Sequence, residues 1–404
     1  MKHYSPYQFA FFRMILGTYL IIHFAMLIPY ADEIWSNKGV MADNSLNFTY
    51  GIFPSVFDLY DSPYFVKTVV SLLLFLSILF SLGFFRQTVS ILLWYGWVCL
   101  FDRNNLISNP GIPFVGWILL CCAFVPSGEP LTVFPKKNEA WEFPKLLFWG
   151  AWIIMSLGYT MSGIDKLNSP SWLDGSAIIH LLNNPLARDI PTREFLLSLP
   201  ATLLNTITWS ILILEIIFAP LAILSITRKW IWTGVVLMHF GILLVVDFAD
   251  LTFGMLMIHL FTFDSRWLQP RHNNTKVQIL FFDGVCGLCN NTVDLLMKED
   301  RNDTLRFAPL QGETAKKYLP EQKIKHLNSV VFFRDGKIFT HSKAIIETAR
   351  SMGGFMKLLV ILKIVPADIR DLFYNIIADK RYKWFGVKET CRMPSEKERG
   401  KLLY

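Results

Sequence analysis

Long apolar runs separated by short polar connections fill the first two thirds of the chain, and this pattern ends near residue 270. A helix needs about 20 mostly apolar residues to cross a bilayer. We therefore predict a bundle of about eight membrane spans, with an amphipathic or partly inserted element on the outer side at 164–200. The expected spans are 7–29, 64–84, 87–101, 112–126, 145–163, 203–225, 229–247 and 251–264.

From Lys276 onward the pattern becomes that of a small α/β domain. Short apolar runs alternate with amphipathic ones in the order β-α-β-α-β-β-α, which is a thioredoxin-like arrangement. A helical tail is expected from about 355 to 385, and 390–404 is expected to lack regular structure. The predicted elements are a buried strand at 277–283, a helix at 289–300, a strand at 304–310, a short helix around 313–319, two strands about an Asp335-Gly336 turn within 329–341, and a helix at 342–352.

The expected fold class is thus an α-helical polytopic membrane bundle in 1–270, followed by a small α/β thioredoxin-like domain in 271–404. Composition supports this division. Of the 404 residues, 53% are hydrophobic and only 18% are charged, against about 25% charged in an ordinary soluble protein. A typical soluble enzyme and a disordered chain are both excluded by these values.

Charge is distributed unevenly between the two parts. Residues 1–270 carry 15 Lys and Arg against 17 Asp and Glu, whereas 271–404 carry 24 against 15. A basic soluble part could bind nucleic acid, but attraction to the anionic cytoplasmic leaflet explains the charge more simply, so we expect a lipid bilayer as partner and no nucleic acid. With the N-terminus inside, the inner loops hold most loop Lys and Arg, which places both termini in the cytoplasm.

The first apolar run indicates a retained span. It begins near Pro6, contains Arg13 and lacks a clear small-residue cleavage site. A cleavable signal peptide would have such a site, so we expect this run to stay in the membrane.

The motif Asp283-Gly284-Val285-Cys286-Gly287-Leu288-Cys289 lies where the first predicted strand meets the first helix of the α/β domain. Cys286 faces the unpaired amides and positive dipole end of that helix, which favours its thiolate. Cys289 lies about one turn further on and is placed to close a disulfide. Asp283 could relay a proton to this resolving thiol, and Gly284 and Gly287 let the backbone turn sharply.

Two other interpretations of the CxxC pair stay open. The cysteines could be half of a metal site or two structural thiols. Zinc needs two further ligands, and Cys391 and His341 do not stand in a paired spacing, so we favour redox chemistry and expect no metal. The remaining cysteines lie in apolar runs and are expected to be packing residues: Cys99, Cys121 and Cys122.

Ionisable residues in the apolar spans are the other candidates, because such groups are costly in a membrane. Lys166 ends an apolar helix and either acts as a base in a dry site or snorkels to the interface beside Asp165. Glu215 lies in mid-span and needs a partner in a structural or a catalytic pair. Its possible partners are Arg13, His239 and His259. We expect His23 to be a packing residue.

Several segments of the second part resemble the DCC family of thiol-disulfide oxidoreductase-like proteins, in order along 276–391. The resemblance implies a thioredoxin-like fold with Cys286 as nucleophile, Cys289 as resolving thiol and Asp283 as support. One departure from ordinary thioredoxins is that their cis-proline position falls near Asn328 here. The matching segments are DGVCGLC, RFAPLQ at 306–311, VVFFRDGKI at 330–338, Ser342-Lys343-Ala344 and YNIIADKRYKWFG at 374–386.

The first part resembles the HTTM domain, the membrane module of vitamin K-dependent γ-glutamyl carboxylase and its bacterial relatives, over about 5–268. The resemblance implies that Lys166 matches the base that deprotonates vitamin K hydroquinone, and that the bundle binds a quinone or other isoprenoid-like lipid. Leu106 replaces the carboxylase's histidine, so we do not predict glutamate carboxylation. The matching segments are FRMILG at 12–17, SGIDKLNSPSWLDG at 162–175, LEIIFAP at 214–220 and FGMLMIHLFTFDSRW at 253–267.

Three functions are compared on this basis. The favoured one is a membrane-anchored thiol-disulfide oxidoreductase that acts on a protein or small-molecule thiol or disulfide, with possible coupling to a quinone near Glu215, His239 and Arg13. The second is a carboxylase-like enzyme that modifies a lipid or peptide at Lys166, with a regulatory redox domain. The third is a non-catalytic accessory or immunity protein. The expected location is a cell membrane, by analogy the bacterial inner membrane, with the C-terminal domain cytoplasmic.

Overall fold

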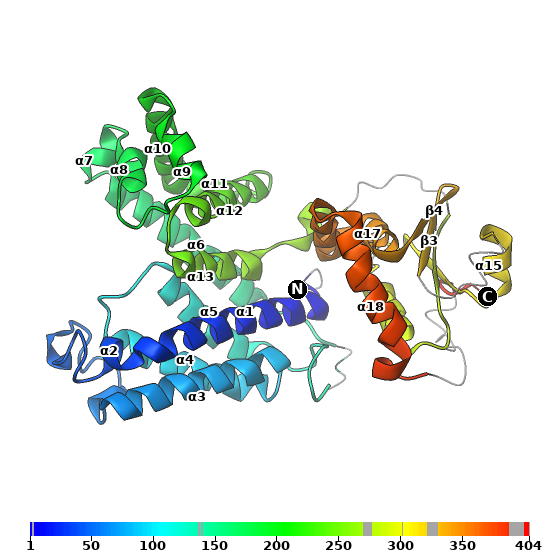
Figure 1. Ribbon diagram of the computed structural model, residues 1–404, viewed down its shortest axis with the longest axis horizontal. Coiled ribbons are helices and arrows are strands. Elements are labelled where there is room, and N and C mark those ends of the chain that lie inside the picture. The colour runs from blue at the N-terminus through cyan, green and yellow to red at the C-terminus, as the bar shows by residue number, and fades with distance from the viewer. Residues whose placement is uncertain are drawn as a thin grey trace. The chain divides into compact units, whose positions relative to one another are not determined.

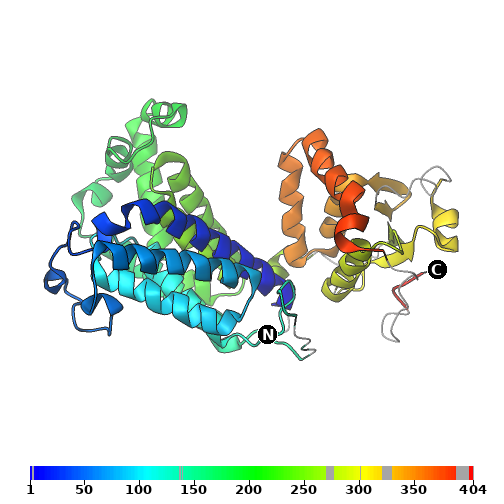
Figure 2. The ribbon, with the colours of Figure 1, turned by 60° about the horizontal axis from the view of Figure 1, so that its bottom comes forward.

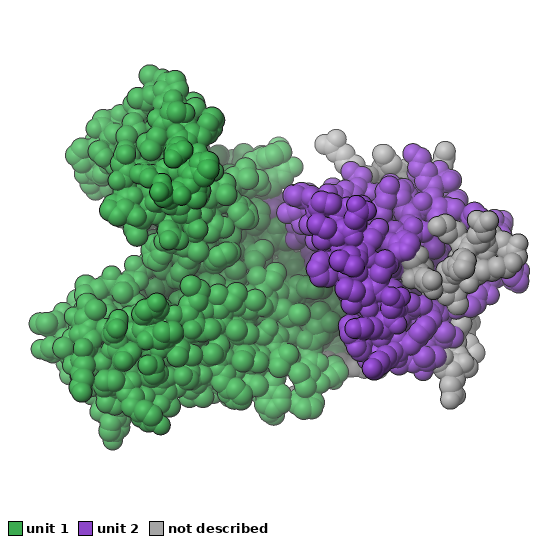
Figure 3. Space-filling view, in the orientation of Figure 1, with its two compact units in different colours: residues 1–264 green, residues 265–404 purple. Residues whose placement is uncertain are grey.

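The computed structural model describes residues 1, 4–135, 138, 140–269, 277–300, 302–320, 330–387 and 400–403. The chain divides into two compact units between Asp264 and Ser265 (Figures 1 and 3). Unit 1 comprises residues 1–264 and unit 2 residues 265–404, and each is described here by itself.

Unit 1 is mostly helical. Helices α1, α3 and α4 run side by side (Figures 1 and 2), and α5, α6 and α13 pack next to them. The helices are α1 Pro6–Leu27, α2 Ala31–Trp35, α3 Pro63–Leu82, α4 Arg86–Arg103, α5 Gly111–Phe124, α6 Lys145–Lys166, α7 Pro170–Leu173, α8 Ala177–Leu182, α9 Pro191–Leu197, α10 Ala201–Ile216, α11 Phe218–Ile223, α12 Arg228–Val245 and α13 Ala249–Thr262, with 3-10 turns η1 Ile28–Tyr30, η2 Asn44–Leu46 and η3 Val56–Asp58.

Local sequence signals set several of these boundaries. Ser5 caps α1 by accepting the N–H of Gln8, and Ser62 caps α3 in the same way; a proline follows each cap at the first helical position. Helix α3 ends at Gly83, which adopts a left-handed φ of 73°. Gly17 lets α1 approach α3 closely, because a Cβ there would lie 2.6 Å from the Cβ of Ser81.

Each of the eight predicted spans contains a helix, but their number as spans is not confirmed. Among the described residues, four helical stretches are long and apolar enough to cross a membrane. Helices α5 and α13 are apolar but shorter, and α9 with α10 forms a pair bent by 105°. The four stretches are Pro6–Trp35, Pro63–Leu82, Lys145–Lys166 and Arg228–Val245.

The span predicted at 203–225 is broken between α10 and α11. Pro220 has no N–H, so it cannot complete the helical hydrogen bond to the carbonyl of Ile216. The hydroxyl of Thr160 on α6 lies 3.3 Å from that carbonyl and accepts the N–H of Ala219 at 3.0 Å. A neighbouring helix therefore replaces the bonds lost at the break.

Unit 2 is a four-stranded mixed sheet with helices. The sheet order is β2-β1-β3-β4; β1 pairs parallel with β2 and antiparallel with β3, and β3 pairs antiparallel with β4. Apolar side chains of β1 enter a separate core cluster on each face of the sheet. The elements are η4 Ser265–Leu268, β1 Gln278–Phe282, α14 Gly287–Glu299, β2 Arg306–Pro309, α15 Glu313–Tyr318, β3 Val331–Arg334, β4 Lys337–Thr340, α17 His341–Met352, η5 Gly354–Ile364 and α18 Ala367–Phe385.

The described elements follow the predicted order β-α-β-α-β-β-α. Asp335 and Gly336 form the predicted turn, both with positive φ. The described residues of the segment predicted to lack regular structure, 400–403, form no helix or strand. They are nevertheless held against the sheet, since Phe307 of β2 exchanges two backbone hydrogen bonds with Lys401 and Leu403. Leu402 joins the core there because it is apolar and only 5% exposed. Asn328 and Cys391 lie outside the described residues.

Candidate active site

Cys286 lies at the junction of β1 and α14 and is the N-cap of that helix. Its Sγ accepts the backbone N–H of Cys289 at 3.1 Å. The buried amide of Asn290 fixes the loop by donating to the carbonyls of Gly284 at 2.8 Å and Cys286 at 2.9 Å. The first cysteine thus faces the helix N-terminus as the sequence predicts, and both cysteines are free thiols.

The end of α18 covers Cys286. Val387 forms an isolated antiparallel bridge with Cys286, and the N–H of Gly287 donates to the carbonyl of Gly386 at 3.1 Å. As a result Cys286 is 0% exposed, whereas Cys289 is partly exposed.

Gly284 and Gly287 were both predicted to allow a sharp backbone turn, and the structure does not support this role for either glycine. Neither Gly284 nor Gly287 has a positive φ, so a sharp turn does not require glycine at either position. Gly287 is needed for a different reason. A Cβ there would lie 2.2 Å from the carbonyl oxygen of Phe385, so only glycine allows the end of α18 to approach so closely.

Four donors converge on the carboxylate of Asp283, which is 4% exposed. Its Oδ1 accepts from Gln311 Nε2 at 2.9 Å and from the N–H of Val285 at 3.2 Å. Its Oδ2 accepts from Arg381 Nη2 at 3.4 Å and from the hydroxyl of Tyr382. Burial and the bond to Asp283 raise the pKa of Tyr382, which keeps the hydroxyl a donor. Asp283 therefore joins the CxxC loop to the segment after β2 and to α18.

Burial raises the pKa of the Cys289 thiol, and Cys286 and the carboxylate of Asp283 raise it further, whereas Arg381 lowers it. The thiol that the sequence assigns as resolving thus has a carboxylate and a guanidinium near it with opposite effects. The balance between Asp283 and Arg381 therefore influences the pKa at which Cys289 becomes a thiolate.

The described residues contain no group of three or more His, Cys, Asp or Glu side chains that could hold a metal ion. Two adjacent thiols at a helix N-terminus support thiol–disulfide exchange.

In unit 1, Lys166 and Glu215 form an ion pair of 2.6 Å between α6 and α10. The ammonium also donates to Ser162 Oγ at 2.7 Å and lies 5.1 Å from the ring centre of Trp172. Lys166 therefore pairs with Glu215, and not with the adjacent Asp165 that the sequence offered as its partner. The lysine and glutamate predicted as separate candidates form a single pair.

His239 lies in a different cluster. Its Nε2 lies 2.7 Å from the hydroxyl of Tyr159, and His259 Nε2 lies 3.5 Å from the same hydroxyl. Neither histidine is the partner of Glu215.

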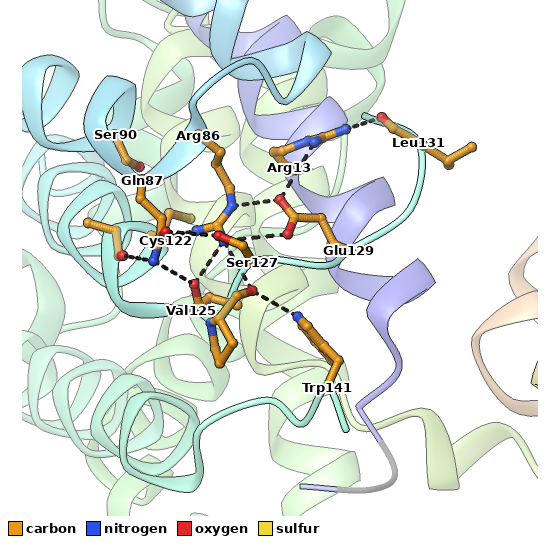
Figure 4. Close-up of polar contacts among 12 residues, drawn as sticks. Arg13, Arg86, Gln87, Ser90, Cys122, Val125, Ser127, Glu129, Leu131 and Trp141 are labelled. Carbon is orange, nitrogen blue, oxygen red and sulfur yellow. Dashed lines mark hydrogen bonds and ion pairs between the residues drawn. The ribbon is translucent and has the colours of Figure 1, made fainter. Parts of the chain in front are cut away.

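Arg13 is fully buried and lies with Arg86 and Glu129, so the predicted pairing of Arg13 with Glu215 is not what the structure shows (Figure 4). Arg13 Nη1 is 3.7 Å from Glu129, and Nη2 donates to the carbonyl of Leu131 at 2.5 Å. Glu215, His239 and Arg13, which were predicted to share one quinone site, therefore have different direct partners in unit 1.

His23, predicted to be a packing residue, lines a cavity of about 280 Å³ with a largely apolar wall that includes Trp35 and Trp97. Its Nδ1 lies 2.6 Å from the Asp250 carboxylate, which also accepts from Asn109 at 3.1 Å. The carboxylate orients the imidazole, whose other nitrogen has no hydrogen bond to any described residue. The only signal of this site in the sequence is that two polar residues, His23 and Asp250, stand in or next to predicted apolar spans.

Comparison with known proteins assigns unit 2. The family described as DCC1-like thiol-disulfide oxidoreductase matches residues 280–387. The uncharacterized protein YuxK of Bacillus subtilis is 38% identical over 128 residues, which are 31% of this chain and 93% of YuxK. The chain belongs to the DCC family. The DCC family protein At1g52590, chloroplastic, of Arabidopsis thaliana is 33% identical over 121 residues, 29% of this chain and 70% of that protein. No solved structure matches the chain.

The DCC match also contains three site residues to which the sequence analysis gave no role. Gln311, Arg381 and Tyr382 all contact Asp283 and lie within the matched range. Gln311 is the last residue of the segment RFAPLQ, and Arg381 and Tyr382 lie within YNIIADKRYKWFG. The resemblance of these two segments to the DCC family was the available signal. What it could not show is that both segments converge on one carboxylate.

Proposed function

We propose that this chain is a membrane-anchored thiol-disulfide oxidoreductase whose reaction occurs at Cys286 and Cys289. The observation that carries this proposal is the Cys286 Sγ held at the N-terminus of α14, 3.1 Å from the amide of Cys289. Membership of the DCC family supports it. A thioredoxin-like fold for unit 2 agrees with its order of elements.

The reaction transfers two electrons between a dithiol and a disulfide. The Cys286 thiolate attacks one sulfur of a substrate disulfide, and the other substrate sulfur leaves as a thiolate and takes up a proton. Cys289 then loses its proton and attacks Cys286, which releases the second substrate thiol and forms the Cys286–Cys289 disulfide. The substrate is reduced as the protein dithiol is oxidised, and the reverse sequence oxidises a substrate dithiol. Asp283, with Arg381, positions the loop and influences the loss of the Cys289 proton.

A trapping experiment tests this proposal. With Cys289→Ser, a mixed disulfide on Cys286 cannot resolve, so we expect acid-quenched membranes to yield a protein or small thiol attached to Cys286. Non-reducing gels and mass spectrometry identify the adduct. Cys99→Ser, at a buried cysteine of α4, is the matched control and should trap nothing. A Cys286 that stays free under both oxidising and reducing growth contradicts the proposal.

We further propose that unit 1 is an HTTM-like membrane domain in a cell membrane, that unit 2 lies in the cytoplasm, and that unit 1 binds a quinone or other isoprenoid-like lipid. The cavity at His23 supports the lipid site better than the Lys166–Glu215 pair does, because it combines an apolar wall with an oriented imidazole. Added quinone should change the redox state of the CxxC pair. If neither quinone nor quinol changes the redox state of the CxxC pair, the proposed coupling is wrong.

The carboxylase-like alternative centred on Lys166 has weaker support. The ammonium donates to both Glu215 and Ser162, so it must lose these bonds before it acts as a base. Lys166→Ala would abolish activity under this alternative, whereas Cys286→Ser would only modulate it. The opposite result favours the dithiol reaction.

A further inference from the structure

Exposed apolar side chains of unit 2 are concentrated in one stretch of its chain. Among the described residues of unit 2, every exposed large hydrophobic residue except Val277 and Ile345 lies between Leu358 and Val387. This stretch comprises η5 and α18, which both pack against α17 (Figure 1). Proteins rarely leave large apolar surfaces exposed unless a partner or a membrane covers them. The dithiol reaction proposed above does not use this surface.

In η5 the exposed apolar residues follow the three-residue repeat of a 3-10 helix. Side chains three positions apart eclipse one another in such a helix, so Leu358, Ile361 and Ile364 form one ridge. Ile361 is 67% exposed and Ile364 is 82% exposed. Met356, by contrast, is buried in a core cluster of unit 2. The helix thus contacts the domain on one side and presents an apolar ridge on another.

In α18 the exposed apolar residues follow the three- and four-residue spacing of an α-helix, which places them on one side. Phe373 is 63% exposed, whereas Ala378, about half a turn away from this side, is buried. The exposed stripe comprises Ile369, Leu372, Phe373 and Ile376.

Lysines border the apolar stripe. Lys380 and Lys383 are exposed and continue it at the same spacing, and the Lys380 ammonium lies 5.5 Å from the ring centre of Trp384. Residues 354–387 carry six Lys and Arg against three Asp, of which Asp368 and Asp379 are exposed at the edge of the stripe. Aliphatic and aromatic side chains with a basic border match the interface of a bilayer that contains anionic headgroups.

The chain connects this surface closely to the proposed membrane domain. Helix α13 ends at Thr262, and η4 begins at Ser265 and packs against η5. Three residues span at most about 10 Å. This step rests on the proposed membrane placement of unit 1: when α13 ends at the bilayer surface, η4 begins within that distance of it. A bilayer surface is then within reach of the η5 ridge.

We propose that the apolar ridge of η5 and the apolar stripe of α18 dock unit 2 on an anionic bilayer surface. The aliphatic and aromatic side chains enter the headgroup region, which removes them from water. Lys380 and Lys383 contact lipid phosphates. Unit 2 is thereby held to the membrane by a second contact, besides its covalent link to unit 1.

Fluorescence quenching on the full chain in lipid nanodiscs tests the proposal. The nanodiscs contain phosphatidylcholine with phosphatidylglycerol, and a nitrobenzoxadiazole label is attached at Ile376→Cys. In the labelled chain the three cysteines of unit 2 are serine, and the described cysteines of unit 1 are buried. A lipid with a doxyl group near its headgroup should quench this label at least threefold more than the same label at Glu313→Cys. Glu313 is exposed on α15, which packs against β2 at the other edge of the sheet.

The label distinguishes a bilayer from other partners. A blue-shifted emission at position 376 without quenching by the doxyl lipid would assign the surface to unit 1 or to a second copy of the chain, and would overturn the proposal. Equal quenching at positions 376 and 313 would overturn it as well. Carbonate extraction tests the anchoring by unit 1 separately. A chain that carbonate removes is not anchored, but its label still decides the docking, because quenching needs only contact with lipid.

A pair of charge variants tests the role of the lysines. Lys380→Glu combined with Lys383→Glu should reduce quenching of the label at position 376 at least twofold. Lys316→Glu combined with Lys317→Glu, at two exposed lysines of α15, is the matched control and should leave the quenching unchanged. Nanodiscs of phosphatidylcholine alone should reduce quenching of the parent chain as the first pair does. Unchanged quenching in phosphatidylcholine alone and in the first pair would contradict docking on an anionic surface.

Discussion

At the scale of single residues, Asp283 and Arg381 define the electrostatics of the dithiol. They lie 3.4 Å apart and affect Cys289 in opposite directions. Because Asp283 also holds Gln311 and Tyr382, its charge and its hydrogen bonds serve different purposes. The charge affects the thiol, and the bonds fix the loop.

Neutralising either residue should therefore move the pKa of Cys289 in a known direction. Asp283→Asn removes a cause that raises this pKa, so the thiolate forms at lower pH and alkylation at pH 8 should become severalfold faster. Arg381→Gln removes the cause that lowers the pKa, so alkylation should become severalfold slower. The measurement is the pH profile of iodoacetamide modification at Cys289 in a Cys286→Ser background. Shifts in the same direction for both variants would contradict this assignment.

Residue types at this site were predictable from the sequence, but their partners were not. The CxxC spacing and the preceding strand identified Cys286, Cys289 and Asp283. The contact of Asp283 with Arg381 joins residues 98 positions apart, and no local pattern encodes such a contact. The ion pair of Lys166 was unpredictable for the same reason. Its partner in the structure is the distant Glu215, and not the adjacent Asp165 that the sequence suggested.

At the scale of elements, the end of α18 is the feature that controls access to the first thiol. Gly287→Ala would place a methyl group against the Phe385 carbonyl, 2.2 Å away. We expect this to displace residues 385–387 and to raise the alkylation rate of Cys286 at least tenfold. Gly400→Ala, where a Cβ meets nothing within 4 Å, should have no effect. Unchanged reactivity in Gly287→Ala would show that the segment does not shield Cys286.

Helix α17 is tied to its neighbours by Glu347, which is 3% exposed and pairs with Arg334 of β3 at 3.0 Å and Lys363 of η5 at 2.5 Å. Burial alone would raise the pKa of Glu347, but Lys363, Arg334 and Arg350, which lies 3.7 Å away on the same helix, outweigh it and lower the pKa. The unfolded chain therefore binds the proton at higher pH than the folded one. The stabilisation is present above the ordinary glutamate pKa of about 4.3 and is lost as pH falls through the folded value.

Glu347→Gln should lower the unfolding free energy of unit 2 by about 1–3 kcal/mol at pH 7, and the difference should shrink toward pH 3. Thermal unfolding of residues 265–404 measures it, since YuxK shows that a chain of about this extent occurs separately. The control is Glu313→Gln, whose ion pair with Lys316 is exposed. A difference that persists at pH 3 would exclude the charge as its cause.

Elements of unit 2 followed the sequence well because strand and helix periods are local signals. Unit 1 was harder. Apolar length predicted a helix for every span, but the span predicted at 203–225 is broken between α10 and α11, and α5 is only 14 residues long. Whether such helices cross a bilayer depends on neighbours such as Thr160, which replace lost backbone bonds. A count of spans therefore needs more than hydropathy.

At the scale of the whole molecule, orientation is the outcome that most affects function. The proposed orientation has both termini in the cytoplasm, on the side of the basic loop residues. An epitope tag after Tyr404 should thus resist protease in right-side-out vesicles and be cleaved in inside-out ones. The opposite cleavage pattern would contradict this orientation and would place the dithiol in a compartment where disulfides persist.

The cover over Cys286 also bears on damage by peroxide. A fully buried thiol is shielded from this oxidant, whereas the partly exposed Cys289 is accessible to it once it becomes a thiolate. A sulfenic acid formed at Cys289 condenses with a neighbouring thiol to give a disulfide, before irreversible sulfinic acid can form. Residues 385–387, which cover Cys286, thus confine oxidation to a disulfide that thiol exchange can reverse.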